Sequence, residues 1–172
     1  MIRKKHDRIG IGELVQMEVL YGRFTSNWGR ENELQLLNSI QKNYPIGEIV
    51  FKQGGMTTCI SGNNTLRTIV KAFKGKEVFF DLNKNEFGIT TSPFQELEFW
   101  QIPFRELFCG REFYKFQKVL LEFKNIKITE EINLFLERYE AIGNQLANFE
   151  VSVVEIHNAS ESELVELTRI LN

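Results

Sequence analysis

Apolar residues recur at helical spacing in several parts of this chain. Residues 31–44 place Leu36, Leu37, Ile40 and Tyr44 on one face and are followed by Pro45, which predicts a helix that ends before the proline. Residues 112–147 carry two further apolar stripes of this kind, which predicts a pair of amphipathic helices packed as a hairpin. Another helix is predicted after a polar loop, and its apolar positions are Leu66, Ile69, Val70 and Phe73.

Short apolar or alternating runs between these helices predict strands. Ser160, with Glu163 three residues later, is a capping box that predicts a final helix. Strands and helices are therefore mixed along the chain, and we expect an α+β fold with a small mixed sheet, flanking helices and a C-terminal helical hairpin. The predicted strands are residues 48–51, 56–60, 77–82, 87–91 and 149–156, of which 77–82 and 87–91 form a hairpin.

A single domain is expected over residues 1–172, because no repeat or Pro/Gly-rich linker divides the sequence. Within it we expect a mixed-sheet core over residues 13–91, the helical hairpin over 112–147, and a closing strand and helix over 149–172.

The composition is that of an ordinary globular protein, with 42% hydrophobic and 26% charged residues. No apolar stretch is long enough for a membrane span and the start lacks a signal peptide, so we expect a cytoplasmic protein without a membrane partner. The formal charge of -2 gives no general attraction to nucleic acid. A local patch is needed for such binding, and the Arg/Lys-rich residues 1–8 are the candidate, although a solvated terminus is the simpler interpretation.

Few residues are available for metal or nucleophilic chemistry. The chain has two aspartates, Asp7 and Asp81, and two histidines, which argues against a two-metal nuclease or a histidine-rich site. Cys59 and Cys109 lack metal-ligand spacing and are expected to be reduced core residues. No catalytic residue and no metal ligand is assigned.

The polar loop before the helix of Leu66 is the main candidate site. Backbone N–H groups at a helix N-terminus, a glycine and two amides are suited to binding an anion or a phosphate. Taken alone, the loop is more simply explained by the preference of Ser, Asn and Thr for caps and turns. Its residues are Ser61, Gly62, Asn63, Asn64 and Thr65.

Two aromatic segments are further candidates. Trp28 is interpreted as a core anchor rather than a base-stacking residue, whereas Arg23 is equally well a phosphate ligand or a satisfied neighbour of Trp28. The aromatic residues of 94–108 have few basic residues among them, which favours core packing or a protein partner over a nucleic-acid platform.

The order of these segments resembles the ParB-like (ParB/sulfiredoxin-like) N-terminal domain of GmrSD-type restriction proteins over nearly the whole chain. That family has a Gln-Arg...Trp start, a Pro-Ile-Gly strand entry and an Asp-Gly-Gln-Gln-Arg loop. The matching segments here are Gly22-Arg23...Trp28, Pro45-Ile46-Gly47, Ser61-Gly62-Asn63-Asn64-Thr65-Leu66-Arg67, Phe79-Phe80-Asp81-Leu82, Val151-Ser152-Val153-Val154-Glu155-Ile156 and Arg169-Ile170-Leu171-Asn172.

The resemblance implies a role in restriction of modified or foreign DNA, with the loop binding or hydrolysing a nucleoside triphosphate, and with magnesium only in an active enzyme. Ser61 stands in place of the family's Asp and Thr65 in place of its Arg, so a carboxylate and a cation important for phosphoryl chemistry are missing. Asn63 and Asn64 replace the two glutamines. Arg67, two positions after Thr65, retains a cation that can bind phosphate.

We therefore expect a catalytically degenerate domain that binds a nucleotide, nucleic acid or a partner protein and regulates or antagonises a DNA-targeting system. Its expected ligand-binding residues are Arg23, Trp28, Gly47, Ser61, Gly62, Asn63, Asn64, Thr65 and Arg67. One alternative is an active NTPase or nuclease with catalytic groups relocated to Glu13, Glu48 or Asp81. Another is a structural or interaction module that binds a protein through residues 94–147.

Overall fold

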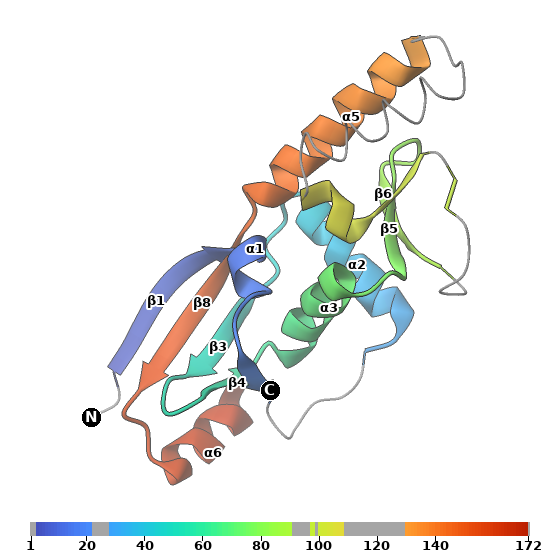
Figure 1. Ribbon diagram of the computed structural model, residues 1–172. Coiled ribbons are helices and arrows are strands. Elements are labelled where there is room, and N and C mark those ends of the chain that lie inside the picture. Colours follow the sequence, from blue (N-terminus) through green and yellow to red (C-terminus); the bar gives the residue numbers. More distant parts are fainter. Residues whose placement is uncertain (1–2, 22–27, 91–96, 99, 109–129, 172) are drawn as a thin grey trace.

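The computed structural model describes residues 3–21, 28–90, 97–98, 100–108 and 130–171. They form the α+β fold expected from the sequence, with a five-stranded mixed sheet, a small three-stranded sheet and helices packed against them (Figure 1). The strands of the larger sheet are β1 (Arg3–Gly10), β2 (Val19–Tyr21), β3 (Glu48–Lys52), β4 (Thr57–Ser61) and β8 (Glu150–His157).

The five-stranded sheet has the order β1-β8-β3-β4-β2. β8 runs antiparallel to β1 and parallel to β3, β3 runs antiparallel to β4, and β4 runs parallel to β2. β8 carries apolar side chains on both faces: Val151 and Val153 join the main core, whereas Val154 and Ile156 join a smaller cluster on the other face. This pattern is typical of an interior strand covered on both sides.

The smaller cluster is covered by helix α6 (Glu161–Leu171), whose Leu164 and Leu167 pack on it. The predicted capping box is confirmed. The backbone N–H and the hydroxyl of Ser160 donate to the Glu163 carboxylate at 2.8 Å and 2.7 Å, and the Glu163 N–H lies 3.4 Å from the Ser160 hydroxyl oxygen.

The main core is formed by both sheets together with helices α2 (Arg30–Gln41) and α3 (Asn63–Lys74). Leu36, Leu37 and Ile40 of α2 are buried as their spacing predicted. The placement of Tyr44 on the same face is wrong, because α2 ends at Gln41 and Tyr44 is exposed beyond it. On α3, Leu66 and Ile69 are buried, but Val70 and Phe73 are only partly buried. The apolar face of α3 is therefore wider than the part that the core covers.

The second sheet contains the predicted hairpin, β5 (Val78–Asp81) and β6 (Glu86–Ile89), with β7 (Gln101–Pro103) on the other side of β5. The expectation of one small mixed sheet is thus wrong, because the hairpin belongs to a separate sheet. Asp81 shapes its turn, since its carboxylate accepts the N–H groups of Asn83 and Lys84, both at 3.0 Å.

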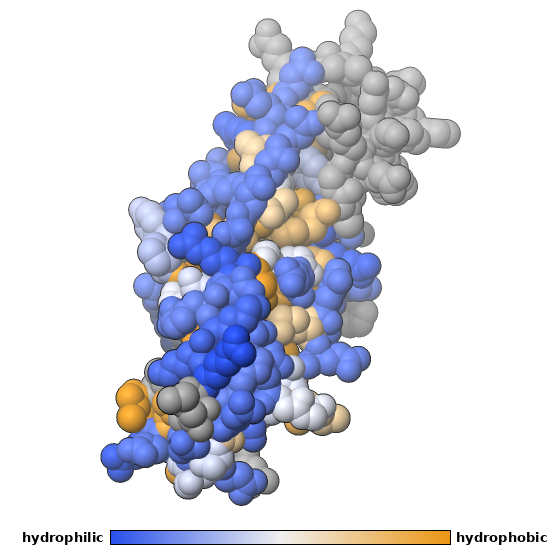
Figure 2. All heavy atoms as spheres, turned by 90° about the vertical axis from the view of Figure 1, so that its left-hand side faces the viewer, coloured by the Kyte–Doolittle hydropathy of each residue, from blue (hydrophilic) through white to orange (hydrophobic). Residues whose placement is uncertain are grey.

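The basic N-terminal segment is a strand, which its sequence did not predict, and its charged side chains are solvated as the simpler interpretation of this segment expects. β1 pairs with β8 along its whole length, from Arg3 opposite His157 to Gly10 opposite Glu150. The side chains of residues 3–8 are exposed, and the surface on this side of the molecule is mostly hydrophilic (Figure 2). The helix α1 (Ile11–Leu14) follows and buries Ile11 and Leu14 in the core.

The second half of the predicted helical hairpin is helix α5 (Glu130–Ala147), and its predicted partner lies outside the described residues. Phe135, Tyr139, Ile142 and Leu146 form its buried stripe. The Tyr139 hydroxyl donates to the carbonyl of Glu106, at 2.7 Å, in the 3₁₀ helix η1 (Phe104–Phe108). Trp100, Phe104 and Phe108 pack in or against the core, which confirms core packing for that described part of the aromatic segment.

In the described part of the chain, no helix combines the length and apolar character that a membrane crossing requires.

Candidate ligand-binding site on helix α3

The polar loop of the sequence connects the end of β4 at Ser61 to the start of α3 at Asn63. Gly62 is the N-cap residue and has a left-handed backbone with φ of +76°. A Cβ atom on Gly62 would lie 3.0 Å from the carbonyl oxygen of Glu48 and 3.1 Å from Ile49. Glycine is therefore required both by the backbone conformation and by close packing against the start of β3.

Asn63 and Thr65 point into the protein and are only 5% and 7% exposed. The N-cap is a glycine without a side-chain hydrogen bond, so the explanation of the loop by a capping Ser, Asn or Thr is wrong. Asn63 is also engaged in an interaction within the protein. The loop thus presents few side chains to a ligand, and Asn64 is the loop amide that reaches a surface hollow.

The hollow has a volume of about 540 Å³ and lies along the outer face of α3. Asn64, Arg67, Lys71 and Lys74 follow one another at steps of three and four residues, so they form one stripe on the helix. The hollow is lined by Tyr21, Trp28, Glu33, Asn64, Arg67, Thr68, Val70, Lys71 and Lys74.

Two aromatic side chains accompany this basic stripe. The Arg67 guanidinium carbon lies 4.8 Å from the centre of the Tyr21 ring, which is cation–π distance. Trp28 is partly buried, packs against the main core and also lines the hollow. The position of Trp28 is thus compatible both with a role in the core and with a contact to a ligand.

The charges of the hollow are mainly positive. Lys71 is paired with Glu33 at 2.9 Å and lies 3.9 Å from Glu77, whereas Arg67 and Lys74 form no salt bridge within the described residues. Burial raises the pKa of the Tyr21 hydroxyl, against the opposing effect of Arg67, so Tyr21 stays neutral and is a hydrogen-bond donor at neutral pH. Glu33 is the one carboxylate among the lining residues, and its pairing with Lys71 occupies it.

The other predicted site residues lie elsewhere. Gly47 is exposed with φ of +81° in the turn before β3, and Ser61 and Gly62 are at the packed start of α3. Arg23 lies outside the described residues. The structure therefore brings together Trp28, Asn64 and Arg67 of the predicted set, and adds Tyr21, Thr68, Lys71 and Lys74.

Sequence reasoning missed Lys71 and Lys74, although their spacing from Arg67 signals a shared helix face. Tyr21 had no comparable signal, because it is brought to α3 by the pairing of β2 with β4.

Among the residues that the structure describes, no constellation of carboxylates, thiols or imidazoles accompanies the hollow. The three carboxylates considered as relocated catalytic groups lie on separate elements: Glu13 on α1, Glu48 on β3 and Asp81 on β5. The Asp81 carboxylate also accepts backbone hydrogen bonds in the turn after β5. Over the described ranges, no group of three metal-ligating side chains is present. Burial raises the pKa of Cys59 to about 12, and its buried thiol is a free core cysteine as expected; Cys109 lies outside the described residues.

Comparisons with protein-family models and with curated proteins give no match for this chain. The chemistry of the site therefore has to be inferred from its geometry. A hollow with cations, a neutral phenol, an amide and an indole can bind an anionic ligand that also has a flat apolar part.

Proposed function

We propose that this protein binds a nucleotide, or a nucleotide unit of a nucleic acid, in the hollow on α3 and does not hydrolyse it. The observation that carries the proposal is the convergence of Arg67, Lys74, Tyr21 and Trp28 on one concave surface. Cations bind phosphate through charge-assisted hydrogen bonds, and aromatic rings stack on bases.

The size and position of the hollow fit such a ligand. Its volume of about 540 Å³ lies within the roughly 300–1,000 Å³ usual for small-molecule sites. Asn64 and the first turn of α3 are at one end, where the helix dipole favours negative charge. Lys74 is at the other end, three turns along the helix. A phosphate near Arg67 and Asn64 leaves Trp28 or Tyr21 for the base.

We propose an absence of turnover because the groups that phosphoryl chemistry needs are engaged, buried or substituted. Glu33 is engaged by Lys71, Cys59 is buried and neutral, and Ser61 and Thr65 stand where the resembled GmrSD loop has Asp and Arg. We propose on the same basis that the chain is a degenerate relative of the ParB-like N-terminal domain of GmrSD-type proteins. Its role would then be to regulate or antagonise a DNA-targeting system in the cytoplasm by binding rather than cleavage.

Calorimetric titration tests this proposal, with ATP, ADP and a short DNA duplex as ligands. Arg67→Ala removes the central cation, and we expect the Kd of the bound ligand to rise by about 10- to 100-fold, which is the usual effect of losing a charge-assisted hydrogen bond. Lys76→Ala is the matched control, because Lys76 is an exposed cation just beyond α3 that does not line the hollow. The Kd of the ligand for Lys76→Ala should stay within twofold of its Kd for the wild type.

Phosphate release is measured in parallel, with and without magnesium. We expect none above background. Binding that Arg67→Ala and Lys76→Ala weaken equally would contradict the assigned site, because it would indicate a general charge effect. Turnover that Glu13→Gln, Glu48→Gln or Asp81→Asn abolishes would instead support the enzyme with relocated groups.

A further inference from the structure

The positive charge of the hollow on α3 is divided between two separate centres. Arg67 and Lys74 form no salt bridge within the described residues, and they are seven residues apart, which is about 10 Å along the helix. Lys71 lies between them, but its charge is offset by Glu33 at 2.9 Å and Glu77 at 3.9 Å. The adjacent phosphates of one nucleotide share a bridging oxygen, so a single cluster of cations would suit them better than two centres do.

Two aromatic side chains also line the hollow. Tyr21 is at the end of β2, and Trp28 precedes α2. The Tyr21 ring lies against Arg67, whose guanidinium carbon is 4.8 Å from the ring centre. One nucleotide has one base and stacks on one of these rings. The second ring and the second cation are therefore left for a neighbouring nucleotide.

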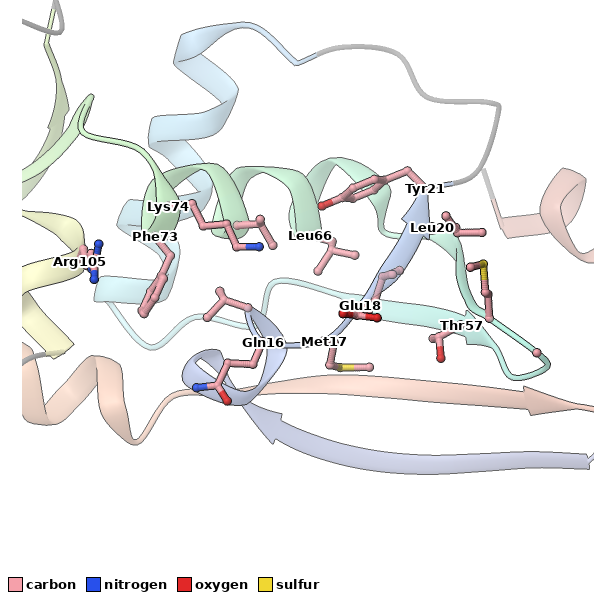
Figure 3. Close-up of a pocket in the computed structure, with 15 residues that line it drawn as sticks. Gln16, Met17, Glu18, Leu20, Tyr21, Thr57, Leu66, Phe73, Lys74 and Arg105 are labelled. Carbon is pink, nitrogen blue, oxygen red and sulfur yellow. The ribbon is translucent and has the colours of Figure 1, made fainter.

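The surface beside the hollow leaves room for a longer ligand. Tyr21, Val70 and Lys74 also line a second hollow, which has a volume of about 1040 Å³. Figure 3 shows the Tyr21 ring beside α3 on one side of this second hollow, and Gln16 and Met17 on the other side. The two hollows thus adjoin each other along α3, and further nucleotides of a chain can continue from one into the other.

We propose that the ligand of this site is a single strand of DNA or RNA, with phosphates of different nucleotides at Arg67 and Lys74 and with bases stacked on Tyr21 and Trp28. Cations and aromatic rings along one groove are the means by which proteins bind single strands with little sequence preference. A duplex is disfavoured, because its bases are stacked on one another and their faces are not open to aromatic side chains. This inference rests on the nucleotide binding proposed above and adds the class of ligand.

Fluorescence anisotropy with a labelled single strand of about eight adenylates tests the inference, and ADP competes as the matched single nucleotide. We expect the strand to bind about 100-fold more tightly than ADP, because it adds a second phosphate contact and a second stacked base. A strand of the same length without bases should bind about tenfold more weakly than the adenylate strand. Adenylate and deoxyadenylate strands, which differ in the 2′-hydroxyl alone, are compared to distinguish RNA from DNA.

The salt dependence of binding measures how many phosphates the protein neutralises. For single strands, the logarithm of Kd rises with the logarithm of the salt concentration with a slope of about 0.7 per phosphate, so Arg67 and Lys74 together give about 1.4. Lys74→Ala should lower this slope by about 0.7 and weaken binding of the strand about tenfold. Lys76→Ala removes an exposed cation outside the hollow and should change neither quantity.

A pair of variants at Tyr21 tests the stacking contact. Tyr21→Ala should weaken binding of the strand about tenfold, whereas Tyr21→Phe keeps the ring and should bind the strand within about twofold of the wild type. If circular dichroism shows that Tyr21→Ala is not folded, the strand without bases supplies the same test on the wild-type protein.

Binding of ADP as tight as that of the strand would overturn this inference and leave the nucleotide proposal standing, whereas no binding of either ligand would overturn both. Three further results would overturn this inference alone: tighter binding of a duplex than of the single strand, undiminished binding of the strand without bases, or equal effects of Lys74→Ala and Lys76→Ala on the salt dependence.

Discussion

Gly62 and Gly47 share a left-handed backbone but have different surroundings. A Cβ on Gly62 would meet Glu48 and Ile49 at 3.0 Å and 3.1 Å, whereas a Cβ on Gly47 has no heavy atom within 4 Å. Left-handed backbone costs an L-residue about 1–2 kcal/mol. We expect Gly47→Ala to lower the free energy of unfolding by about this amount and Gly62→Ala to lower it by more.

Urea unfolding of the two variants checks this expectation. Equal losses in the two would contradict the close packing of the α3 start against β3, and with it the conclusion that Gly62 is packed against β3 rather than open to a ligand.

At the residue scale, the sequence predicted part of the candidate site. Asn64 and Arg67 were identified from the polar loop and lie in the hollow, but Asn63 and Thr65, from the same loop, are buried. The difference depends on which side of α3 faces the sheet, and the polar character of these residues alone does not predict that side. Tyr21 is 46 residues before Arg67, and the pairing of β2 with β4 brings them together.

The capping box of α6 gives a prediction at the scale of the element. Hydrogen bonds from the Ser160 backbone N–H and hydroxyl lower the pKa of Glu163. A lowered pKa in the folded state stabilises the fold at pH above the ordinary glutamate value of about 4.3, and this contribution is lost as the pH falls through the folded value. Glu163→Gln should therefore be less stable than the wild type at pH 7, and this deficit should shrink as the pH is lowered toward 3.

Thermal unfolding followed by circular dichroism at pH 7 and pH 3 measures this difference. Glu166→Gln is the control, because Glu166 lies farther along α6 and outside the capping box. A deficit of Glu163→Gln that persists unchanged at pH 3 would contradict the role of the ionised carboxylate.

Elements with a strong apolar period were predictable. α2, α3, β3, β4 and the β5–β6 hairpin lie close to their expected ranges, because each buries one face. The sequence of β1 has no such period: its first six side chains are exposed and the strand is held by the backbone ladder to β8. β2 is three residues long and mostly exposed, so it too lacked a signal. The assignment of two sheets depends on long-range pairing of β5 with β7.

At the scale of the whole molecule, α3 separates two surfaces of different chemistry. The hollow with Arg67 and Trp28 is cationic and aromatic, whereas a second hollow, which residues 15–21 line together with Leu66, Val70 and Phe73 of α3, has a largely apolar wall. Tyr21 and Lys74 line both.

The most direct test of the central claim is to map where a nucleotide binds, by amide chemical shifts of the labelled protein titrated with ADP. We predict the largest shifts around Asn64, Arg67 and Lys71, with saturation at the Kd measured by calorimetry. Shifts concentrated instead on the basic strand β1, around Lys4, His6 and Arg8, or no saturable shifts at all, would contradict the assignment of the site to α3.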